Sequence, residues 1–510
     1  MNFPRASGVL LHPTSLPGPF GLGEIGPHAR QFADALVEMK QSLWQVLPIG
    51  PTGYADSPYQ SLSTFAGNPM LISFDLLARE GLVTRSRLAS FPEFPRGHVD
   101  FGPVILARTA VLQTACRAFD SRAAKSKKKA FETFCEKQAH WLDDFALFFA
   151  LKQAHELKPW TEWAPELAAR EPSALKAAAR KFQTLIRHVK VEQFLFADQW
   201  SRLRKYCHKR GIQIVGDIPI FVAHDSADVW SHPELYYLDE RGFPTIVSGV
   251  PPDYFSATGQ LWGNPLYRWD VHRQTGYAWW VARMKHIFDL VDIVRIDHFR
   301  GFEAYWEIPG HEKTAINGRW VPGPGADLFN VLHEKLGRLP IIAEDLGVIT
   351  PAVEHLRDQF QFPGMRILQF AFGNDAKAAD YRPESYPPNC VVYSGTHDND
   401  TTVGWFRSEP GKNSTRSPED IAKERQAILD YLKTDGHEIH WDLIGLAQRS
   451  RANTVAFPLQ DLLGLDSSAR MNVPGTCGEN WKWRFTWEQL TPEIRQRLRE
   501  MTLAAGRAGA

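Results

Sequence analysis

Cysteine is scarce in this chain of 510 residues, and it follows no pattern. The five cysteines, Cys116, Cys135, Cys207, Cys390 and Cys477, are odd in number, widely scattered, and include no C-x-x-C pair. A disulfide framework or a zinc knuckle needs cysteines at short, regular spacing, so the sequence argues against both. Unpaired thiols are typical of a reducing compartment, and we therefore expect a cytoplasmic protein.

An excess of charge of either sign is also missing, because 58 Lys and Arg balance 58 Asp and Glu. Nucleic-acid binding needs a basic surface that replaces counterions, and nothing global supplies one. No stretch approaches the roughly 18 apolar residues that a membrane span needs. The first residues also lead into Pro- and Gly-rich sequence without an apolar signal segment. We expect a soluble protein with no nucleic-acid or membrane partner, and the oligomeric state stays open.

Aromatic residues, in contrast, are abundant at 12%, with 17 Trp, 13 Tyr and 31 Phe. Several tryptophans lie in Gly- and Pro-rich segments, where core packing explains them less well: Trp262, Trp320, Trp481 and Trp483. Exposed indoles stack well on the apolar faces of sugar rings. The alternative is that a buried indole holds each loop against the surface. The sequence leaves both interpretations open.

Eight short apolar or β-branched runs recur along the chain, each ending in polar residues, Gly or Pro. Such runs are typical of parallel strands that are buried on both faces. Segments with helical periodicity lie between them, which favours right-handed βαβ units and a closed (β/α)8 TIM barrel of the α/β class. The predicted strands are 8–12, 43–49, 213–220, 292–299, 339–346, 366–372, 389–397 and 453–461, and the clearest predicted helices are 28–40, 191–210, 277–290, 327–336 and 351–360.

Two segments interrupt this alternation of strands and helices. Residues 82–190 are rich in Ala, Lys and Glu and show helical periodicity, which predicts an inserted helical subdomain. Residues 238–269 are rich in Gly, Pro and aromatics, and we interpret them as a long irregular active-site loop, because long loops in compact domains are usually functional. We therefore expect the first barrel elements in 1–81, the insertion in 82–190 and the remaining barrel in 191–510.

Polar residues interrupt the apolar runs at the ends of four predicted strands, where a barrel of this kind places its active site. Carboxylates avoid such positions unless they are paired or functional. Four strands that bring acids to one rim are a stronger signal than any single acid. These residues are Asp217, Arg295 with Asp297, Glu344 with Asp345, and His397 with Asp398.

Two carboxylates on either side of a sugar bond are the minimum for cleaving a glycoside. Arg295 lies two residues before Asp297 and points to the same side of its strand, so its charge would keep Asp297 ionised and ready to attack. Glu344 follows an apolar run, where desolvation would raise its pKa as a general acid requires. Two alternatives stay open at this point. The acids could be helix caps and ion-pair partners, or His298 and His397 could join them in a metal site.

Around these residues the sequence resembles the amylomaltases, the 4-α-glucanotransferases of glycoside hydrolase family 77, which are related to the α-amylases. The matching segments cover nearly the whole chain outside the helical insertion. They are Asp56-Ser57-Pro58-Tyr59-Gln60, Gly216-Asp217-Ile218-Pro219, Gly249-Val250-Pro251-Pro252-Asp253-Tyr254-Phe255, Gly259-Gln260-Leu261-Trp262-Gly263-Asn264-Pro265, Val294-Arg295-Ile296-Asp297-His298-Phe299-Arg300-Gly301, Ala343-Glu344-Asp345-Leu346-Gly347, Gly395-Thr396-His397-Asp398-Asn399-Asp400-Thr401 and Asn472-Val473-Pro474-Gly475-Thr476. One departure is Ala55, where the resemblance leads us to expect Gly.

The resemblance implies a retaining double displacement. Asp297 would be the nucleophile that forms a covalent glucosyl-enzyme, Glu344 the general acid and base, and Asp398 the group that holds sugar hydroxyls and favours a distorted ring. No cofactor or metal is implied, and the calcium of many α-amylases is not expected. The resemblance implies substrate contacts from Ser57, Tyr59, Asp217, Tyr254, Gln260, Trp262, Arg295, His397 and, at a greater distance, Asn472.

The implied partners are maltooligosaccharides and α-1,4-glucans as donor and acceptor, with glucose as acceptor or product. The three carboxylates alone do not distinguish a transferase from an α-1,4-glucan hydrolase, since both form the same intermediate. An aromatic loop with Tyr254, Phe255 and Trp262 would bind the acceptor and exclude water, so we predict transfer. A glycan-binding barrel without catalysis is the remaining alternative.

Overall fold

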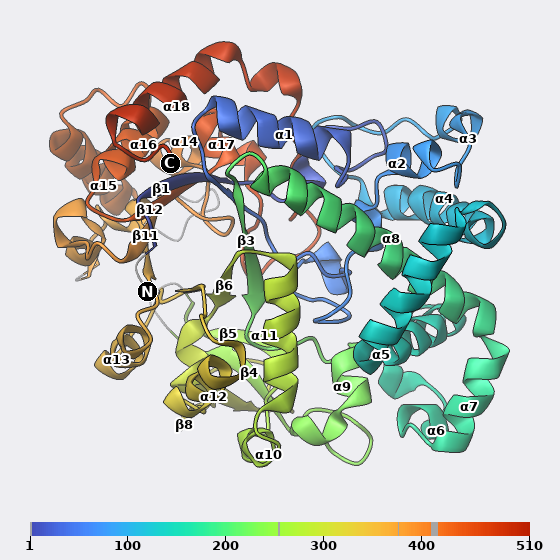
Figure 1. The fold of residues 1–510 in the computed structure, drawn as a ribbon. Helices are drawn as coiled ribbons and strands as arrows, with labels where there is room; N and C mark the ends of the chain where they lie inside the picture. The colour runs from blue at the N-terminus through green and yellow to red at the C-terminus, as the bar shows by residue number, and fades with distance from the viewer. Residues whose placement is uncertain (1–2, 253–255, 376, 410–416, 510) are drawn as a thin grey trace.

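Eight parallel strands form the centre of the structure (Figure 1). The computed structural model describes residues 3–252, 256–375, 377–409 and 417–509. Each strand overlaps one of the eight predicted segments, which confirms that part of the sequence analysis. The strands are β1 (Ala6–Leu10), β2 (Leu43–Gln45), β3 (Gln213–Pro219), β6 (Ile293–Asp297), β9 (Ile341–Ala343), β10 (Gly364–Ile367), β11 (Cys390–Tyr393) and β12 (Thr454–Pro458).

The strands follow one another around the sheet in chain order, from β10 through β11, β12, β1, β2, β3 and β6 to β9. The two ends of this sheet also meet, because the Ala343 amide at the end of β9 donates a hydrogen bond of 2.9 Å to the carbonyl of Pro363, which directly precedes β10. Sequential parallel strands that return to the first strand are the mark of a (β/α)8 barrel. The predicted fold class is confirmed.

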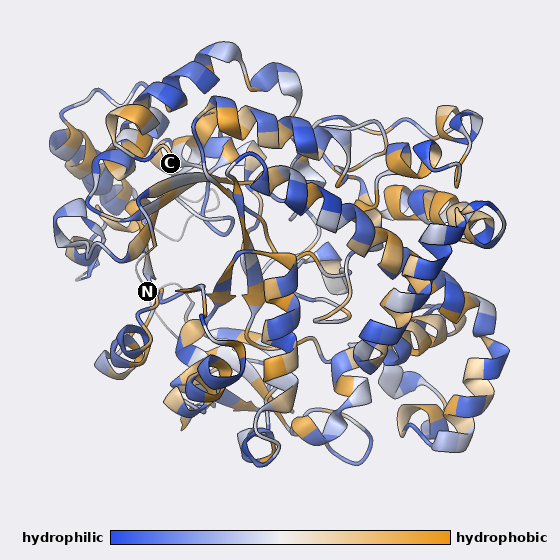
Figure 2. Ribbon diagram, viewed as in Figure 1, coloured by the Kyte–Doolittle hydropathy of each residue, from blue (hydrophilic) through white to orange (hydrophobic). Residues whose placement is uncertain are grey.

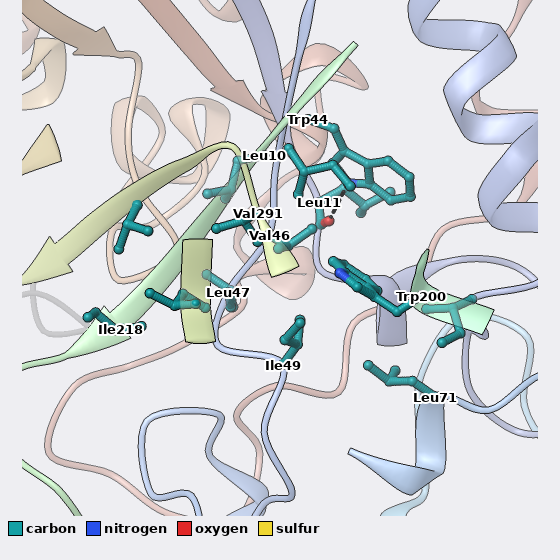
Figure 3. Packing of buried hydrophobic residues seen from close by; sticks show 14 of the residues in the cluster. Leu10, Leu11, Trp44, Val46, Leu47, Ile49, Leu71, Trp200, Ile218 and Val291 are labelled. Carbon is teal, nitrogen blue, oxygen red and sulfur yellow. Dashed lines mark hydrogen bonds between the residues drawn. The ribbon is translucent and has the colours of Figure 1, made fainter. Parts of the chain in front are cut away.

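Side chains alternate between the two faces of each barrel strand. On β6, Ile293 belongs to the cluster inside the barrel, while Val294 and Ile296 pack in the layer between the strands and the helices. Figure 3 shows this outer layer around Trp44, whose indole N–H donates 2.9 Å to the Leu11 carbonyl. The helices of this layer are α1 (Pro27–Glu38), α8 (Gln183–His208), α11 (Ala278–Leu290), α12 (Ala326–Leu336), α13 (Pro351–Gln359), α16 (Ile439–Arg449) and α18 (Pro492–Ala504).

The segment between β2 and β3 is largely helical and lies to one side of the barrel in Figure 1. Its buried aromatic rings include Phe119 and Phe131, whose centroids lie 5.9 and 5.7 Å from that of Phe194 in α8. Figure 2 shows the corresponding mixture of apolar and polar residues on these helices. Insertion and barrel therefore share one hydrophobic core. The helices are α2 (Phe74–Arg79), α3 (Arg85–Ala89), α4 (Phe101–Arg122), α5 (Lys125–Ala154), α6 (Pro165–Ala168) and α7 (Pro172–Lys181).

A second, antiparallel sheet of four strands corrects the expectation of an irregular loop over 238–269. Its strand order is β5 (Gln260–Pro265), β4 (Ile246–Val250), β7 (Ala304–Pro309) and β8 (Arg319–Pro322). Two strands thus come from the supposed loop and two from the segment after β6. Periodicity did not reveal β4 and β5 because Gly and Pro interrupt them and because β4 pairs with β7, a partner that lies after the next barrel strand.

The remaining α-helices of the described ranges are α9 (Ala227–Ser231), α10 (Trp269–Gln274), α14 (Thr402–Phe406), α15 (Pro418–Leu432) and α17 (Leu459–Leu462). In the ranges that the structure describes, no helix is both long enough and apolar enough to cross a membrane.

Candidate active site

The register of β3 and β6 places Asp217 directly beside Arg295 at the mouth of the barrel. Arg295 Nη1 lies 2.7 Å from Asp217 Oδ2, and Arg295 Nη2 lies 3.0 Å from Asp297 Oδ1. The side chain of Asp217 is fully buried, whereas 32% of the Asp297 side chain is exposed. One buried guanidinium therefore joins a carboxylate inside the barrel to a second carboxylate that faces the mouth.

Burial is the strongest influence on the Asp297 carboxyl and raises its pKa above the ordinary value. Arg295 acts in the opposite direction, as its charge stabilises the ionised form, while the charges of Asp217 and Asp398 add to the rise. Arg295 is thus the largest of the influences that favour the charged form of Asp297, ahead of His397.

Glu344 follows β9 and accepts two hydrogen bonds from backbone amides. Its Oε2 accepts a hydrogen bond of 2.7 Å from the amide of His298, the residue after Asp297. Its Oε1 accepts a hydrogen bond of 2.9 Å from the amide of Leu346. Burial, followed by the negative charge of Asp297, raises the pKa of Glu344 to about 8. Glu344 therefore holds a proton at neutral pH beside a carboxylate that has a cation of its own.

Tyr59 and His397 form an aromatic wall at the same rim. The Tyr59 hydroxyl donates a hydrogen bond of 2.8 Å to Asp217 Oδ2. The Tyr59 ring stacks on the His397 ring, with centroids 5.2 Å apart and 14° between the planes. Trp481 packs against both rings at 5.9 and 6.0 Å. Asp217 thus holds the hydroxyl of Tyr59, and the indole of Trp481 supports both rings.

Asp398 follows β11 and has a side chain that is 44% exposed. Its Oδ2 lies 3.4 Å from His397 Nε2, and its Oδ1 accepts 2.6 Å from Asn472 Nδ2. Arg470 joins the loop of Asp398 to the loop of Asn472. It donates a hydrogen bond of 2.6 Å to the Asp398 carbonyl and one of 2.8 Å to the Asn472 carbonyl. Asn472, which we expected to be a more distant glucan contact, therefore touches the carboxylate group itself.

Gln260 and Trp262, two of the implied substrate contacts, are connected to Glu344 by contacts that pass through His298. The indole of Trp262 packs edge-on against the His298 ring at 4.8 Å and donates 3.1 Å to Gln260 Oε1. His298 has a φ of 54°, and this left-handed backbone turns its amide toward Glu344. Gln260 is exposed and Trp262 half-buried. Tyr254 and Phe255 lie outside the described residues.

The last predicted contact, Ser57, is half-buried, and its hydroxyl oxygen accepts 3.3 Å from the Tyr59 amide. Asp345, the other acid after β9, is buried among structural partners, since it pairs with Arg357 and accepts 2.7 Å from the Met365 amide. In the described ranges, no group of three His, Cys, Asp or Glu side chains is close enough to hold a metal ion.

The sequence analysis missed Arg470, which joins two loops at the site, and named Trp481 without placing it beside Tyr59 and His397. A loop arginine gives no signal, but Trp481 was visible as a tryptophan in a Gly-rich segment. The tryptophans of these segments differ in exposure: Trp481 and Trp483 are 6% and 8% exposed, whereas Trp320 is 37% exposed and carries the Arg300 guanidinium 3.7 Å above its ring.

Comparison with known proteins shows the family of this chain. The family model described as 4-alpha-glucanotransferase, glycoside hydrolase family 77, matches residues 11–491. The 4-alpha-glucanotransferase of Thermus thermophilus is 49% identical over 99% of this chain and 100% of its own length. The enzyme of the same name from Synechocystis is 49% identical over 99% of this chain and 98% of its own length.

Among solved structures, the amylomaltase from Streptococcus agalactiae in complex with acarbose superposes with a TM-score of 0.93, with 39% identity over 99% of this chain and 100% of that one. The amylomaltase from Corynebacterium glutamicum has a TM-score of 0.80 at 18% identity, over 99% of this chain and 75% of that one, and shows the shared fold. The family match over almost the whole chain and the full-length relatives agree, and the chain therefore belongs to the 4-alpha-glucanotransferase family, glycoside hydrolase family 77, whose members are also called amylomaltases.

Proposed function

We propose that this 4-alpha-glucanotransferase works by a retaining double displacement in which Asp297 is the nucleophile. One Asp297 oxygen attacks the anomeric carbon of the donor sugar, and the bond from that carbon to the leaving glucan oxygen breaks. The contact with Arg295 supports this role, since it favours the ionised form that attacks. The other Asp297 oxygen has no cation of its own among the hydrogen bonds of the described residues, so it is available for the attack.

Glu344 is the general acid and then the general base in this proposal. Its pKa of about 8 supplies a proton at neutral pH, which passes to the leaving oxygen as the glucosyl ester forms on Asp297. The 4-hydroxyl of the acceptor then attacks the anomeric carbon and gives its proton back to Glu344, while Asp297 leaves. Formation of the ester also removes the Asp297 charge, which lowers the pKa of Glu344 just when it must act as a base.

Asp398 holds hydroxyls of the reacting sugar, in our proposal, from the side opposite Asn472. Its side chain is 44% exposed, and His397 beside it adds a ring nitrogen for another hydroxyl. Tyr59 stacks on the sugar from the wall that it forms with His397. Asp217 is fully buried, so we propose that it acts through its contacts with Tyr59 and Arg295.

The acceptor chain lies along Trp262 and Gln260 in this proposal. The edge-on contact between Trp262 and His298 supports it, because the same histidine donates its amide to Glu344. An acceptor sugar on Trp262 would therefore lie beside the group that removes its proton. Ser57 supports the backbone of Tyr59, and Tyr254 belongs to the same proposal although it lies outside the described residues.

The proposed substrates are α-1,4-glucans and maltooligosaccharides, with glucose as acceptor or product. The observation that carries the proposal is the difference between two carboxyl groups. Asp297 forms an ion pair with Arg295, whereas Glu344 accepts hydrogen bonds from two backbone amides. The experiment is product analysis with maltotriose as the sole substrate. We expect glucose together with a ladder of longer chains, and little increase in the number of reducing ends.

Hydrolysis gives the opposite result in the same experiment. Reducing ends that rise in step with maltotriose consumption, without longer chains, would show that water intercepts the ester. Glucan binding without any change of the sugar would indicate a barrel that binds but does not catalyse.

A further inference from the structure

The loop that carries His397 and Asp398 runs from the end of β11 to the start of α14. Both ends of this loop are bound to one acid, Asp461 of α17. The Ser394 hydroxyl, directly after β11, donates a hydrogen bond of 2.6 Å to Asp461 Oδ2. The Thr402 amide, at the first residue of α14, donates a hydrogen bond of 2.6 Å to Asp461 Oδ1. A single carboxylate therefore joins the two chain segments at the base of the loop.

Asp461 is a buried acid in apolar surroundings. It is 1% exposed and lies in the chain between Leu459 and Leu462, which are fully buried. Burial is the largest influence on its carboxyl and raises its pKa, whereas the hydrogen bonds from Ser394 and Thr402 act in the opposite direction. Within the described ranges, Asp461 takes part in no ion pair. Because burying an acid without a cation costs stability, packing does not explain this residue, and its two hydrogen bonds do.

Inside the loop, further hydrogen bonds connect the base to Asp398. Asn399 Oδ1 accepts hydrogen bonds of 2.9 and 2.8 Å from the amide and the hydroxyl of Thr396. The Thr396 hydroxyl oxygen accepts one of 3.3 Å from the Asp398 amide. From outside the loop, Gln369 donates 2.9 Å to the carbonyl of Asp400. The backbone of Asp398 therefore follows the position of the loop base.

The chain after α17 holds the same loop nearer its surface. Ser467 donates a hydrogen bond of 2.7 Å to the acid two residues after Asp398. Arg470 and Asn472 hold the carbonyl and the carboxylate of Asp398, as described above. Ser467 is exposed, and Arg470 and Asn472 are half-buried, whereas Asp461 is buried. Asp461 is therefore the buried anchor of a segment that contacts the loop along its length.

We propose that Asp461 is a positioning residue for the transfer reaction, which fixes the base of the loop and thereby sets where His397 and Asp398 meet the reacting sugar. Asp461 does not touch the substrate and exchanges no proton with it. The inference rests on the proposed role of Asp398. Because that role concerns the distorted sugar, a displaced loop should weaken binding of the transition state more than binding of the substrate.

The first test is Asp461→Ala in the full chain, which leaves Ser394 and Thr402 without their acceptor. The kcat for maltotriose should fall roughly tenfold or more while KM changes less than about threefold, since a displacement of about 1 Å can cost about a hundredfold in rate. A role in stability alone would lower the melting temperature and leave kcat of the folded enzyme unchanged.

Asp461→Asn tests whether the two contacts are what matters. Its side-chain oxygen can accept from the Thr402 amide, and its NH2 group can donate to the Ser394 oxygen, because a hydroxyl accepts as well as donates. We expect kcat within about threefold of wild type, since both hydrogen bonds are retained without the charge.

Asp228→Ala is the matched control. Asp228 is 4% exposed and likewise accepts hydrogen bonds from a backbone amide and a hydroxyl, those of Thr64, at 2.8 and 2.6 Å. This pair joins α9 to the connection after β2 and includes no residue of the Asp398 loop. Both alanine variants should lower the melting temperature, but Asp228→Ala should keep kcat and KM within about twofold of wild type.

Three results overturn the positioning role: a kcat of Asp461→Ala within twofold of wild type, an equal loss of kcat in Asp228→Ala, and an equal loss in Asp461→Asn. If Asp461→Ala does not fold, Ser394→Ala removes one of the two contacts and should lower kcat roughly threefold or more. An unchanged kcat in that variant also overturns the role.

Asp398→Asn separates this inference from the proposed function. Full activity of Asp398→Asn would overturn the proposed role of Asp398 and, with it, the positioning role of Asp461. Loss of activity in Asp398→Asn together with a normal kcat in Asp461→Ala would overturn the positioning role alone. Loss of kcat in both variants, with recovery in Asp461→Asn, is the expected result.

Discussion

The side-chain amide of Asn472 donates a hydrogen bond of 2.6 Å to Asp398 Oδ1. The two residues lie in different loops, one after β11 and one after α17, and Arg470 ties the backbones of both loops together. Asp398 is 44% exposed and would otherwise be free to rotate toward solvent. The orientation of the Asp398 carboxylate therefore depends on the loop of Arg470 and Asn472, which supplies none of the three proposed catalytic carboxylates.

Asn472→Ala should lower kcat for maltotriose by roughly 10- to 100-fold, since a hydrogen bond to a charged group contributes about 1.5–3 kcal/mol. If Asp398 binds the distorted sugar of the transition state, kcat falls more than KM changes. Steady-state kinetics measure this split.

Asn317→Ala is the matched control for that change. Asn317 donates 3.2 Å to Glu312, so it forms the same amide–carboxylate pair, but on an exposed surface. We expect kinetics within about twofold of wild type. Equal losses in the two variants would contradict a positioning role of Asn472.

Asp297→Asn should remove nearly all activity and keep glucan binding. The amide occupies the same space but cannot form the ester, and the covalent route is then lost. Activity with maltotriose and binding of maltohexaose by calorimetry are the two measurements. Unchanged activity would exclude Asp297 as the nucleophile, and loss of binding with a lowered melting temperature would indicate a structural role.

The raised pKa of Glu344 predicts how activity depends on pH. Its pKa is about 8, so it carries its proton below that pH and loses it above. The value of kcat/KM should therefore fall above about pH 8, approaching tenfold for each pH unit. A profile of kcat/KM from pH 5 to 10 checks this, and a limb that stays flat to pH 10 would contradict the acid role of Glu344.

The same carboxyl also makes stability depend on pH. Its pKa in the folded chain lies above the ordinary value of 4.5, so the folded state holds a proton that the unfolded state releases. This contribution is fully present below about pH 4.5 and is lost as pH rises through about 8. Glu344→Gln should accordingly gain stability relative to wild type from pH 5 to 8, as measured by melting temperatures. A constant difference over that range would contradict the raised pKa.

The barrel was predictable because its strands are apolar on both faces, so that short runs such as those around Val215 and Val392 stand out. The carboxylates were predictable for the same reason, since Asp217 and Asp297 interrupt such runs. The second sheet was not predictable in this way. Its strands, such as Ile246–Val250, pair with segments far along the chain and expose part of their surface.

The partners of each acid were only partly visible in the sequence. Arg295 could be assigned to Asp297, because a spacing of two places both side chains on one face of a strand. The contact of Asn472 with Asp398 could not be assigned, because it depends on how two loops fold over the barrel mouth. Local periodicity carries no information about such contacts.

Arg295→Met should destabilise the protein by about 3–5 kcal/mol, because it leaves the fully buried Asp217 without its cation. Adding Asp217→Asn should restore a large part of this stability but none of the activity, as Asp297 still lacks its partner. Chemical denaturation and maltotriose kinetics of the single and double variants measure both effects. Additive losses of stability would show that the two side chains do not act as a pair.

Ala55 occupies a position where the backbone is left-handed, with φ of 55° and ψ of 27°. This conformation costs a residue with a Cβ roughly 1–2 kcal/mol, which explains why the resemblance leads one to expect glycine there. Ala55→Gly should therefore raise the free energy of unfolding by about 1 kcal/mol, since the relief of strain exceeds the entropy that glycine loses on folding.

The control for that substitution is Ala139→Gly, an exposed change inside α5, which should lower the free energy of unfolding by about 1 kcal/mol. Urea denaturation of both variants measures the two effects, and opposite signs are required. The segment after Ala55 also carries Tyr59, whose hydroxyl and ring are held by Asp217 and His397. These contacts keep the stacking surface in place when the strain is released, so kcat and KM of Ala55→Gly should stay within about twofold of wild type. A gain in stability accompanied by a large rise in KM would instead show that the strained backbone itself positions Tyr59.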